Sequence, residues 1–363
     1  MTLSGKQIRG TTMRIGLTIN YVGDFRDMVD ELVDYEAAGL EIVFVPEAYS
    51  FDAVSQLGFI AARTNRLQVA SGVLPLYTRT PTLLAMTAAG MDYVSGGRFT
   101  LGIGTSGPQV VEGFHGVPFD APLGRTREVV EICRKVWRRE RVQYEGKYYR
   151  LPLPADHGTG LGKPLKLINH PVRERIPIVI GAVGPANVAV TAEIADGWKP
   201  VFYVPECADA VWGSSLRKGH SRRDSALGAL DIITQTYLTI NDDKATIANA
   251  MDGARPLLAR YIGGMGAKGK NFYHSLACRY GYQAAADTVQ DLYLAGRRSD
   301  AEAAVPADLI RKTQLIGSRA EVAERLAAFA ASGVTTVNVT PKAPTRQERV
   351  GLIETTREMV EQL

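Results

Sequence analysis

Short apolar runs rich in β-branched residues alternate along this chain with segments whose apolar residues recur every three or four positions. The runs are typical of strands buried on both faces of a parallel sheet, and the segments between them predict amphipathic helices. Strands are expected at residues 14–21, 41–47, 67–76, 99–105, 177–182, 197–202, 232–240 and 335–341. Eight strands, each followed by a helix, favour a (β/α)8 barrel over a doubly wound sheet.

One connection is too long to join a strand to the next through a single helix. Residues 241–316 lie between the seventh and eighth expected strands, and we expect them to form a helical insertion. Just beyond it, Ser318 and Glu321 make a capping box that begins the next helix, as Asp24 caps the first helix. The whole chain, residues 1–363, is therefore interpreted as one barrel domain with one insertion.

The composition is that of an ordinary globular protein, with 45% hydrophobic and 22% charged residues. A net charge of +4, carried by dispersed basic residues, gives no reason to expect a nucleic-acid partner. The three cysteines lack metal-ligand spacing, and the sequence shows neither a secretory signal nor an apolar run of membrane-spanning length. We therefore expect a cytoplasmic protein with no bound metal and no membrane contact.

A glycine-rich segment after the fourth expected strand has the spacing of a dinucleotide-binding fingerprint. Gly102, Gly104 and Gly107 form G-x-G-x-x-G. Pro108 follows at once, however, and no strand ending in an acidic residue comes at the distance that a ribose contact needs. Three strand–helix units also precede the segment, whereas the fingerprint belongs to the first βα turn. We interpret these glycines as a barrel strand end at which a flat cofactor or a phosphate can approach the backbone.

The expected strand ends carry few groups for acid–base catalysis. They hold no histidine–carboxylate pair, no cysteine nucleophile and no metal-ligand cluster, which suits chemistry that belongs to a bound cofactor. Glu47 is interpreted either as a ligand contact or as part of a salt bridge inside the barrel mouth. The free amides of the helix that begins at Pro185 could hold a phosphate, or the turn there could have no ligand.

Five longer segments follow one another along the expected barrel. They are GRFTLGIGTSGPQVVEGFHG (97–116), RTREVVEICRKVW (125–137), YEGKYYRLP (144–152), IPIVIGAVGP (176–185) and AEIADGW (192–198). Together they resemble the luciferase-like family of flavin and deazaflavin oxidoreductases, and most closely its coenzyme F420-dependent branch. The resemblance implies a luciferase-like (β/α)8 TIM barrel with an insertion near the seventh strand, which is usually a homodimer.

The resemblance also implies where the cofactor binds. It places a non-prolyl cis peptide at Gly72–Val73, in a bulge that backs the deazaflavin ring, and it puts Glu47 against the ring system. Further contacts are expected from the loop after the fourth strand and from the segment near the cofactor phosphate, at Thr105, Ser106, Gly107, Gln109, Gly181, Ala182, Val183 and Gly184. No catalytic residue is assigned, because Ala48 and Gly107 stand where the family's sugar-phosphate dehydrogenases carry a histidine and a glutamate.

These features lead to a hypothesis of function with two alternatives. The leading hypothesis is an F420-dependent oxidoreductase that moves a hydride between C5 of the deazaflavin and a small organic substrate. Aromatic and apolar residues near the strand ends favour a fairly apolar substrate over a sugar phosphate. The alternatives are an FMN-dependent monooxygenase of the same family and a barrel that binds F420 without turnover.

Overall fold

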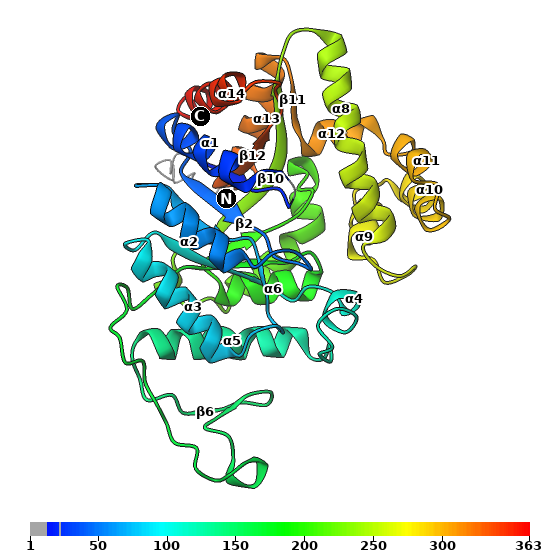
Figure 1. Cartoon of the computed structure of the whole chain (residues 1–363). Helices are drawn as coiled ribbons and strands as arrows, with labels where there is room; N and C mark the ends of the chain where they lie inside the picture. The colour runs from blue at the N-terminus through cyan, green and yellow to red at the C-terminus, as the bar shows by residue number, and fades with distance from the viewer. Residues whose placement is uncertain (1–12, 22) are drawn as a thin grey trace, which may run out of the picture.

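Eight parallel strands close into a barrel, as the alternation of apolar runs predicts (Figure 1). The computed structural model describes residues 13–21 and 23–363. The ring consists of β1 (Arg14–Thr18), β2 (Ile42–Val45), β3 (Gln68–Ser71), β5 (Phe99–Gly104), β8 (Ile178–Gly181), β9 (Gly197–Lys199), β10 (Asp231–Ile240) and β12 (Thr336–Pro341). Pairing of Asp231 with Gly197 closes it between β9 and β10. The expected (β/α)8 fold is therefore confirmed.

The third strand is interrupted where the resemblance implies a bulge. It ends at Ser71 and resumes as β4 (Leu74–Pro75), which pairs with the end of β5. The peptide bond between Gly72 and Val73 is cis, as expected. The interruption turns the backbone at the carboxyl rim of the barrel.

Two groups of side chains fill the interior of the barrel, one apolar and one polar. Ile42, Phe44, Ala70, Val179 and Ile233 form an apolar cluster within it. A polar group made of Thr18, Lys199, Gln235 and Asn338 extends toward the carboxyl ends of the strands. The barrel is thus a packed core rather than a pore, and its polar layer lies next to the rim.

Amphipathic helices cover the outside of the barrel (Figure 1). They are α1 (Phe25–Ala37), α2 (Ala53–Arg63), α3 (Pro81–Val94), α5 (Pro122–Trp137), α6 (Pro185–Ile194), α7 (Ser214–His220), α13 (Arg319–Ala331) and α14 (Arg346–Val360). Asp24 caps α1, and the capping box of Ser318 and Glu321 begins α13, both as predicted. These caps satisfy amides that the first helical turn leaves free.

The long connection between β10 and β12 forms the expected helical insertion. It contains α8 (Lys244–Ala259), a π-helical turn (Arg260–Gly264), α9 (Phe272–Arg279), α10 (Gln283–Leu294), α11 (Arg298–Ala303) and α12 (Ala307–Thr313). The sequence did not predict β11 (Leu315–Gly317), which pairs with β10 outside the ring. Three residues are too few to show a period, so only the tertiary pairing identifies this strand.

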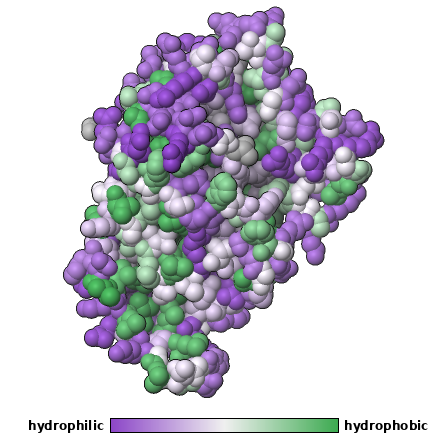
Figure 2. All heavy atoms as spheres, in the orientation of Figure 1, coloured by the Kyte–Doolittle hydropathy of each residue, from purple (hydrophilic) through white to green (hydrophobic). Residues whose placement is uncertain are grey.

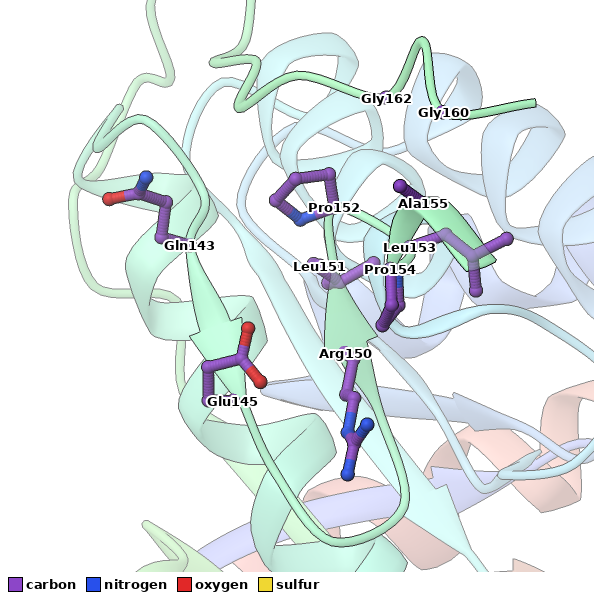
Figure 3. Close-up of a pocket in the computed structure, with 10 residues that line it drawn as sticks. All are labelled: Gln143, Glu145, Arg150, Leu151, Pro152, Leu153, Pro154, Ala155, Gly160 and Gly162. Atoms are coloured by element: carbon purple, nitrogen blue, oxygen red, sulfur yellow. The ribbon is translucent and has the colours of Figure 1, made fainter. Parts of the chain in front are cut away.

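A second excursion, residues 138–177, projects from the body as an arm (Figure 1). It carries the hairpin of β6 (Tyr144–Glu145) and β7 (Arg150–Leu151). The hairpin and the loop after it enclose an open cavity of about 670 Å³, shown in Figure 3. Its lining comes from the arm itself, from Gln143 to Gly162. Among the described helices none is both long and apolar enough to cross a membrane.

Candidate cofactor site

The bulge at Gly72–Val73 is anchored on both sides by the barrel wall. The amide of Gly72 donates to the carbonyl oxygen of Val45 at 2.8 Å. On the other side, the Ser71 hydroxyl donates to the carbonyl oxygen of Gly102 and accepts from the Gly102 amide, both at 2.8 Å. The neighbouring strands β2 and β5 therefore fix the position of the bulge.

A glycine at the end of β5 makes room for the side chain of Val73, and a glycine at the end of β8 borders it. A Cβ atom at Gly104 would lie 2.6 Å from Val73 Cγ2, and one at Gly181 would lie 3.6 Å from Val73 Cγ1. A Cβ atom at Gly102 would overlap the carbonyl oxygen of Ser71. The first two glycines of the apparent fingerprint are thus required by packing against the bulge. They leave a smooth, backbone-rich surface on which a flat ring could rest.

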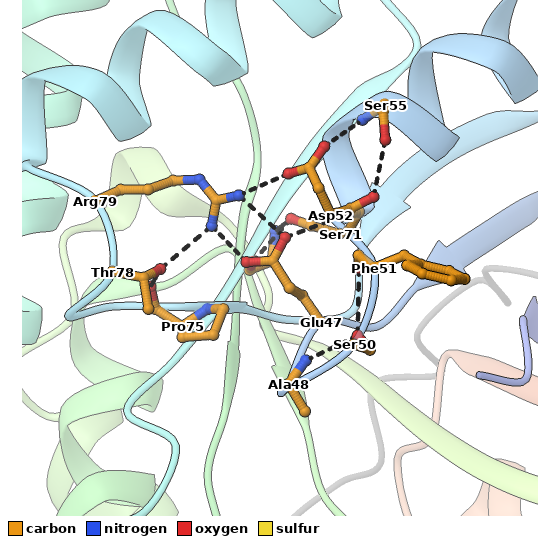
Figure 4. Close-up of polar contacts among 12 residues, drawn as sticks. Glu47, Ala48, Ser50, Phe51, Asp52, Ser55, Ser71, Pro75, Thr78 and Arg79 are labelled. Atoms are coloured by element: carbon orange, nitrogen blue, oxygen red, sulfur yellow. Dashed lines mark hydrogen bonds and ion pairs between the residues drawn. The ribbon is translucent and has the colours of Figure 1, made fainter. Parts of the chain in front are cut away.

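Glu47 is held in an ion pair at this rim (Figure 4). Its carboxylate accepts from Arg79 at 2.5 Å and 3.0 Å and from the Ala53 amide at 2.9 Å. Arg79 also binds Asp52 at 3.0 Å, and hydrogen bonding to Glu47 raises the pKa of the arginine. Of the two interpretations of Glu47, the structure shows the salt bridge. Both carboxylate oxygens are occupied by protein donors, and the contact of Glu47 with the cofactor ring stays a prediction.

The loop after β5 presents polar groups at the rim. Ser106 has a left-handed backbone with φ of 56°, and Gly107 precedes the short helix α4 (Pro108–Val111). The Thr105 hydroxyl donates to the Ser106 carbonyl oxygen at 3.3 Å, while Gln109 is exposed. No other atom lies within 4 Å of a Cβ built on Gly107, so this glycine borders open space. The loop is therefore accessible to a ligand.

The segment that ends β8 is fixed by two tryptophans. The Trp198 indole donates to the carbonyl oxygen of Ala182 at 2.9 Å, and the Trp212 indole donates to that of Val183 at 3.3 Å. Gly184 is the N-cap of α6 and makes no side-chain capping bond. The amides of the first turn thus keep the capacity to bind an anion, which fits a cofactor phosphate.

Lys199, the last residue of β9, points into the polar layer of the barrel. It is 7% exposed, and its Nζ lies 3.5 Å from Thr18 Oγ1, 3.4 Å from Gln235 Oε1 and 4.8 Å from the centre of the Phe44 ring. Burial lowers the pKa of this lysine from 10.5 to about 7. Lys199 lies within the expected strand 197–202, but the sequence assigns it no role, because the direction of its side chain depends on the register of the barrel.

Aromatic residues from the insertion pack over Phe202, which follows β9. Tyr261 meets Phe202 edge-on at 5.3 Å between ring centres, and Tyr273 meets Tyr261 at 4.7 Å. Neither tyrosine hydroxyl hydrogen-bonds to another of the described residues. Burial raises the pKa of both, and it raises that of Tyr21, after β1, to about 12. The tyrosines therefore stay protonated at neutral pH and form an aromatic roof, Phe202, Tyr261 and Tyr273.

The described residues offer no alternative centre for metal or thiol chemistry at this rim. No group of three or more histidine, cysteine or acidic residues among them could hold a metal ion. Burial raises the pKa of all three thiols, so they stay protonated at neutral pH: Cys133, Cys207 and Cys278. The arrangement as a whole suits a ring bound against Val73, a phosphate at α6 and a substrate under the aromatic roof.

Comparisons with known proteins agree with this geometry. A family model described as luciferase-like monooxygenase matches residues 7–336. A Mycobacterium tuberculosis protein provisionally named as a coenzyme F420-dependent oxidoreductase is 41% identical over 90% of this chain and 95% of its own. A 5,10-methylenetetrahydromethanopterin reductase of Archaeoglobus fulgidus is 27% identical over 88% of this chain and 90% of its own.

A solved structure shares the whole fold. The coenzyme F420-dependent tetrahydromethanopterin reductase from Methanopyrus kandleri superposes with a TM-score of 0.78 at 21% identity, over 95% of this chain and 98% of that one. The family model spans most of this chain, and the eight-stranded barrel agrees with the solved structure. The chain therefore belongs to the luciferase-like monooxygenase family.

Proposed function

We propose that this protein is an oxidoreductase that uses coenzyme F420 and transfers a hydride between C5 of the deazaflavin and a small, fairly apolar organic substrate. The observation that carries the proposal is the surface around the Gly72–Val73 bulge, where glycines on β5 and β8 expose backbone beside an anion-binding helix start. The names of the relatives from Mycobacterium tuberculosis and Archaeoglobus fulgidus support F420 as the cofactor.

Each part of the rim has one task in this proposal. Val73 supports one face of the ring, while the loop from Thr105 to Gln109 supplies polar contacts at its edge. The first turn of α6 holds the phosphate. When bound, the deazaflavin supplies a carbon centre that gives or accepts a hydride. The protein orients the reactants and excludes water, which is the usual division of labour in cofactor enzymes.

The aromatic roof determines which substrates are accepted. Phe202, Tyr261 and Tyr273 offer apolar faces, and the two tyrosine hydroxyls can donate a hydrogen bond or a proton to a carbonyl or similar acceptor. Ala48 and Gly107 provide no side chain for acid–base catalysis. A planar carbonyl compound suits this roof better than a sugar phosphate, which would need cationic partners.

Equilibrium titration with F420 and with FMN tests the cofactor. We expect saturable binding of F420 that is tighter than that of FMN. Micromolar binding of FMN without detectable binding of F420 would instead favour the FMN-dependent monooxygenase and overturn the proposal.

A second experiment tests turnover. Reduced F420 should be oxidised steadily by some member of a panel of enones, quinones and nitro compounds. If the protein binds F420 tightly but no compound in the panel is reduced, the non-catalytic F420-binding barrel becomes the better description.

A further inference from the structure

The ammonium group of Lys199 has more N–H donors than there are hydrogen-bond acceptors around it. An ammonium group carries three N–H donors, yet only Thr18 Oγ1 and Gln235 Oε1 lie near Nζ, both at the outer limit of a hydrogen bond. No carboxylate among the described residues makes an ion pair with it. Buried lysines are rare without a partner, because removing the charge from water is costly. The interior of this barrel is thus not built to hold a permanent ammonium ion.

The surroundings of Lys199 are neutral on every side that packs against it. β1 contributes Thr18, β2 contributes Phe44, β10 contributes Gln235 and β12 contributes Asn338 through its bond to Thr18. Burial is the one cause of the lowered pKa, about 7, so no charged group contributes to it. Lys199 therefore gains or loses a proton near neutral pH, depending on the charge of the groups around it.

The lysine is also connected to the bulge. Lys199 pairs in register with Gly181, which in turn pairs with Gly104, and both glycines face Val73. Its ammonium lies over the Phe44 ring, and a Cβ built on Gly72 would lie 2.7 Å from Phe44 Cβ. One aromatic side chain thus separates Lys199 from the backbone of the bulge. Lys199 would therefore lie on the far side of Phe44 from a ring bound against Val73.

We propose that Lys199 selects a cofactor ring that ionises to an anion near neutral pH, which is the hydroxylated deazaflavin ring, over the neutral isoalloxazine ring of FMN. The inference rests on the proposed function and adds a residue that discriminates between its two candidate cofactors. A hydroxyl group conjugated to the pyrimidine end makes the deazaflavin ring an acid whose negative charge is delocalised. Lys199 takes a proton from solvent when this anion binds, so that an ammonium behind the Phe44 ring attracts the anion through a dry interior.

Two ribosides test this assignment with matched ligands. The deazaflavin riboside and riboflavin have the same ribityl chain and no phosphate, so that they differ in the ring alone. Binding is measured by calorimetry at pH 8 in buffers of different ionisation enthalpy, which reports the protons taken up per ring. Absorbance of the bound deazaflavin, whose visible band weakens on protonation, is then followed as a function of pH.

The wild-type protein should take up about 0.4 of a proton per deazaflavin riboside at pH 8, because a rise of one pKa unit from about 7 takes the protonated fraction of Lys199 from about 0.1 to about 0.5. It should take up none with riboflavin. The bound deazaflavin should ionise about one pH unit below the free ring. Lys199→Met should abolish the proton uptake and the shift. It should weaken binding of the deazaflavin anion about twofold at pH 8, where the free lysine is mostly neutral, and about tenfold near pH 6, where the lysine is protonated and one pKa unit corresponds to a factor of ten. Riboflavin affinity should stay within about twofold. Lys199→Gln provides a second variant in case the methionine variant does not fold.

Lys342→Met is the matched control. Lys342 also lies over an aromatic ring, that of Tyr237 at 4.4 Å, but it is exposed and follows β12. This variant should keep the proton uptake and the shift. The inference would be overturned if the bound deazaflavin ionised at the same pH in wild type and Lys199→Met, or if Lys342→Met lost the proton uptake and the shift as Lys199→Met does. Binding of F420 would still uphold the proposed function in either case. A wild-type protein that binds neither F420 nor the riboside would overturn both.

Discussion

Arg79 connects two carboxylates at the rim and keeps one of them from being buried alone. Its side chain is 14% exposed and that of Glu47 is 9% exposed, whereas Asp52 is 52% exposed. Arg79→Met should lower the free energy of unfolding by about 3 kcal/mol, because it leaves the Glu47 carboxylate buried without a counterion. Asp52→Asn, which removes the exposed partner, should cost less than about 1 kcal/mol. Urea denaturation measures both, and equal losses would contradict this view of the pair.

The titration of Lys199 makes a separate prediction about stability. The unfolded chain keeps the lysine protonated up to about pH 10.5, whereas the folded chain releases the proton near pH 7. Between these values the unfolded state binds more protons, so the wild-type free energy of unfolding should rise with pH. Lys199→Met should therefore be more stable than wild type by a few kcal/mol at pH 6, and the difference should shrink toward pH 10. A difference independent of pH, in denaturation experiments across this range, would argue that the lysine is not titrating.

The strand ends and the bulge behave as one structural element. Gly104 lies against Val73, whereas Gly107, three residues on, borders open space. Gly104→Ala should displace the bulge and weaken F420 binding at least about fivefold, since strain of this kind typically costs about 1–3 kcal/mol. Gly58→Ala, on α2 away from the bulge, also has room for its methyl group, so its affinity should stay close to wild type. Fluorescence titration compares the two, and equal affinities would show that the ring does not depend on Val73.

At the scale of the whole molecule, α3 and the arm both expose apolar residues. α3 presents Met86, Tyr93 and Val94, at 54%, 72% and 59% exposure, and the arm presents Leu161 and Ile168, at 84% and 92%. Figure 2 shows apolar residues gathered over this lower part of the molecule. An arm that projects with its apolar side chains uncovered by the same chain suits a second copy, and we propose a homodimer that buries α3 and the arm.

Light scattering on a size-exclusion column tests the dimer. Met86→Glu should convert dimer to monomer, because the charge would be buried at the interface. Leu294→Glu, on α10 of the insertion, changes a side chain that is 53% exposed in a different region and should leave the dimer intact. A wild-type protein that elutes as a monomer would rule out this interface.

Much of the fold follows from the sequence because its signals are local. Strands buried on both faces read as apolar runs, and the caps at Asp24 and Ser318 mark where helices begin. What could not be predicted depends on contacts between distant segments. The pairing of Glu47 with Arg79 joins two loops 32 residues apart, and the inward direction of Lys199 depends on how β9 lies in the ring. The apparent fingerprint misleads for the same reason, because Gly102 and Gly104 pack against the bulge after β3, and their spacing in the sequence does not reveal this contact.

The tryptophans that hold the end of β8 also allow binding at the site to be followed by intrinsic fluorescence. All three tryptophans of the chain are fully buried, and two of them, Trp198 and Trp212, donate to the carbonyls of Ala182 and Val183. Indole emission overlaps the absorption of a deazaflavin, so excitation energy would pass to a cofactor bound beside this segment. Quenching of ultraviolet-excited emission would then follow occupancy in real time, even in variants that turn over no substrate.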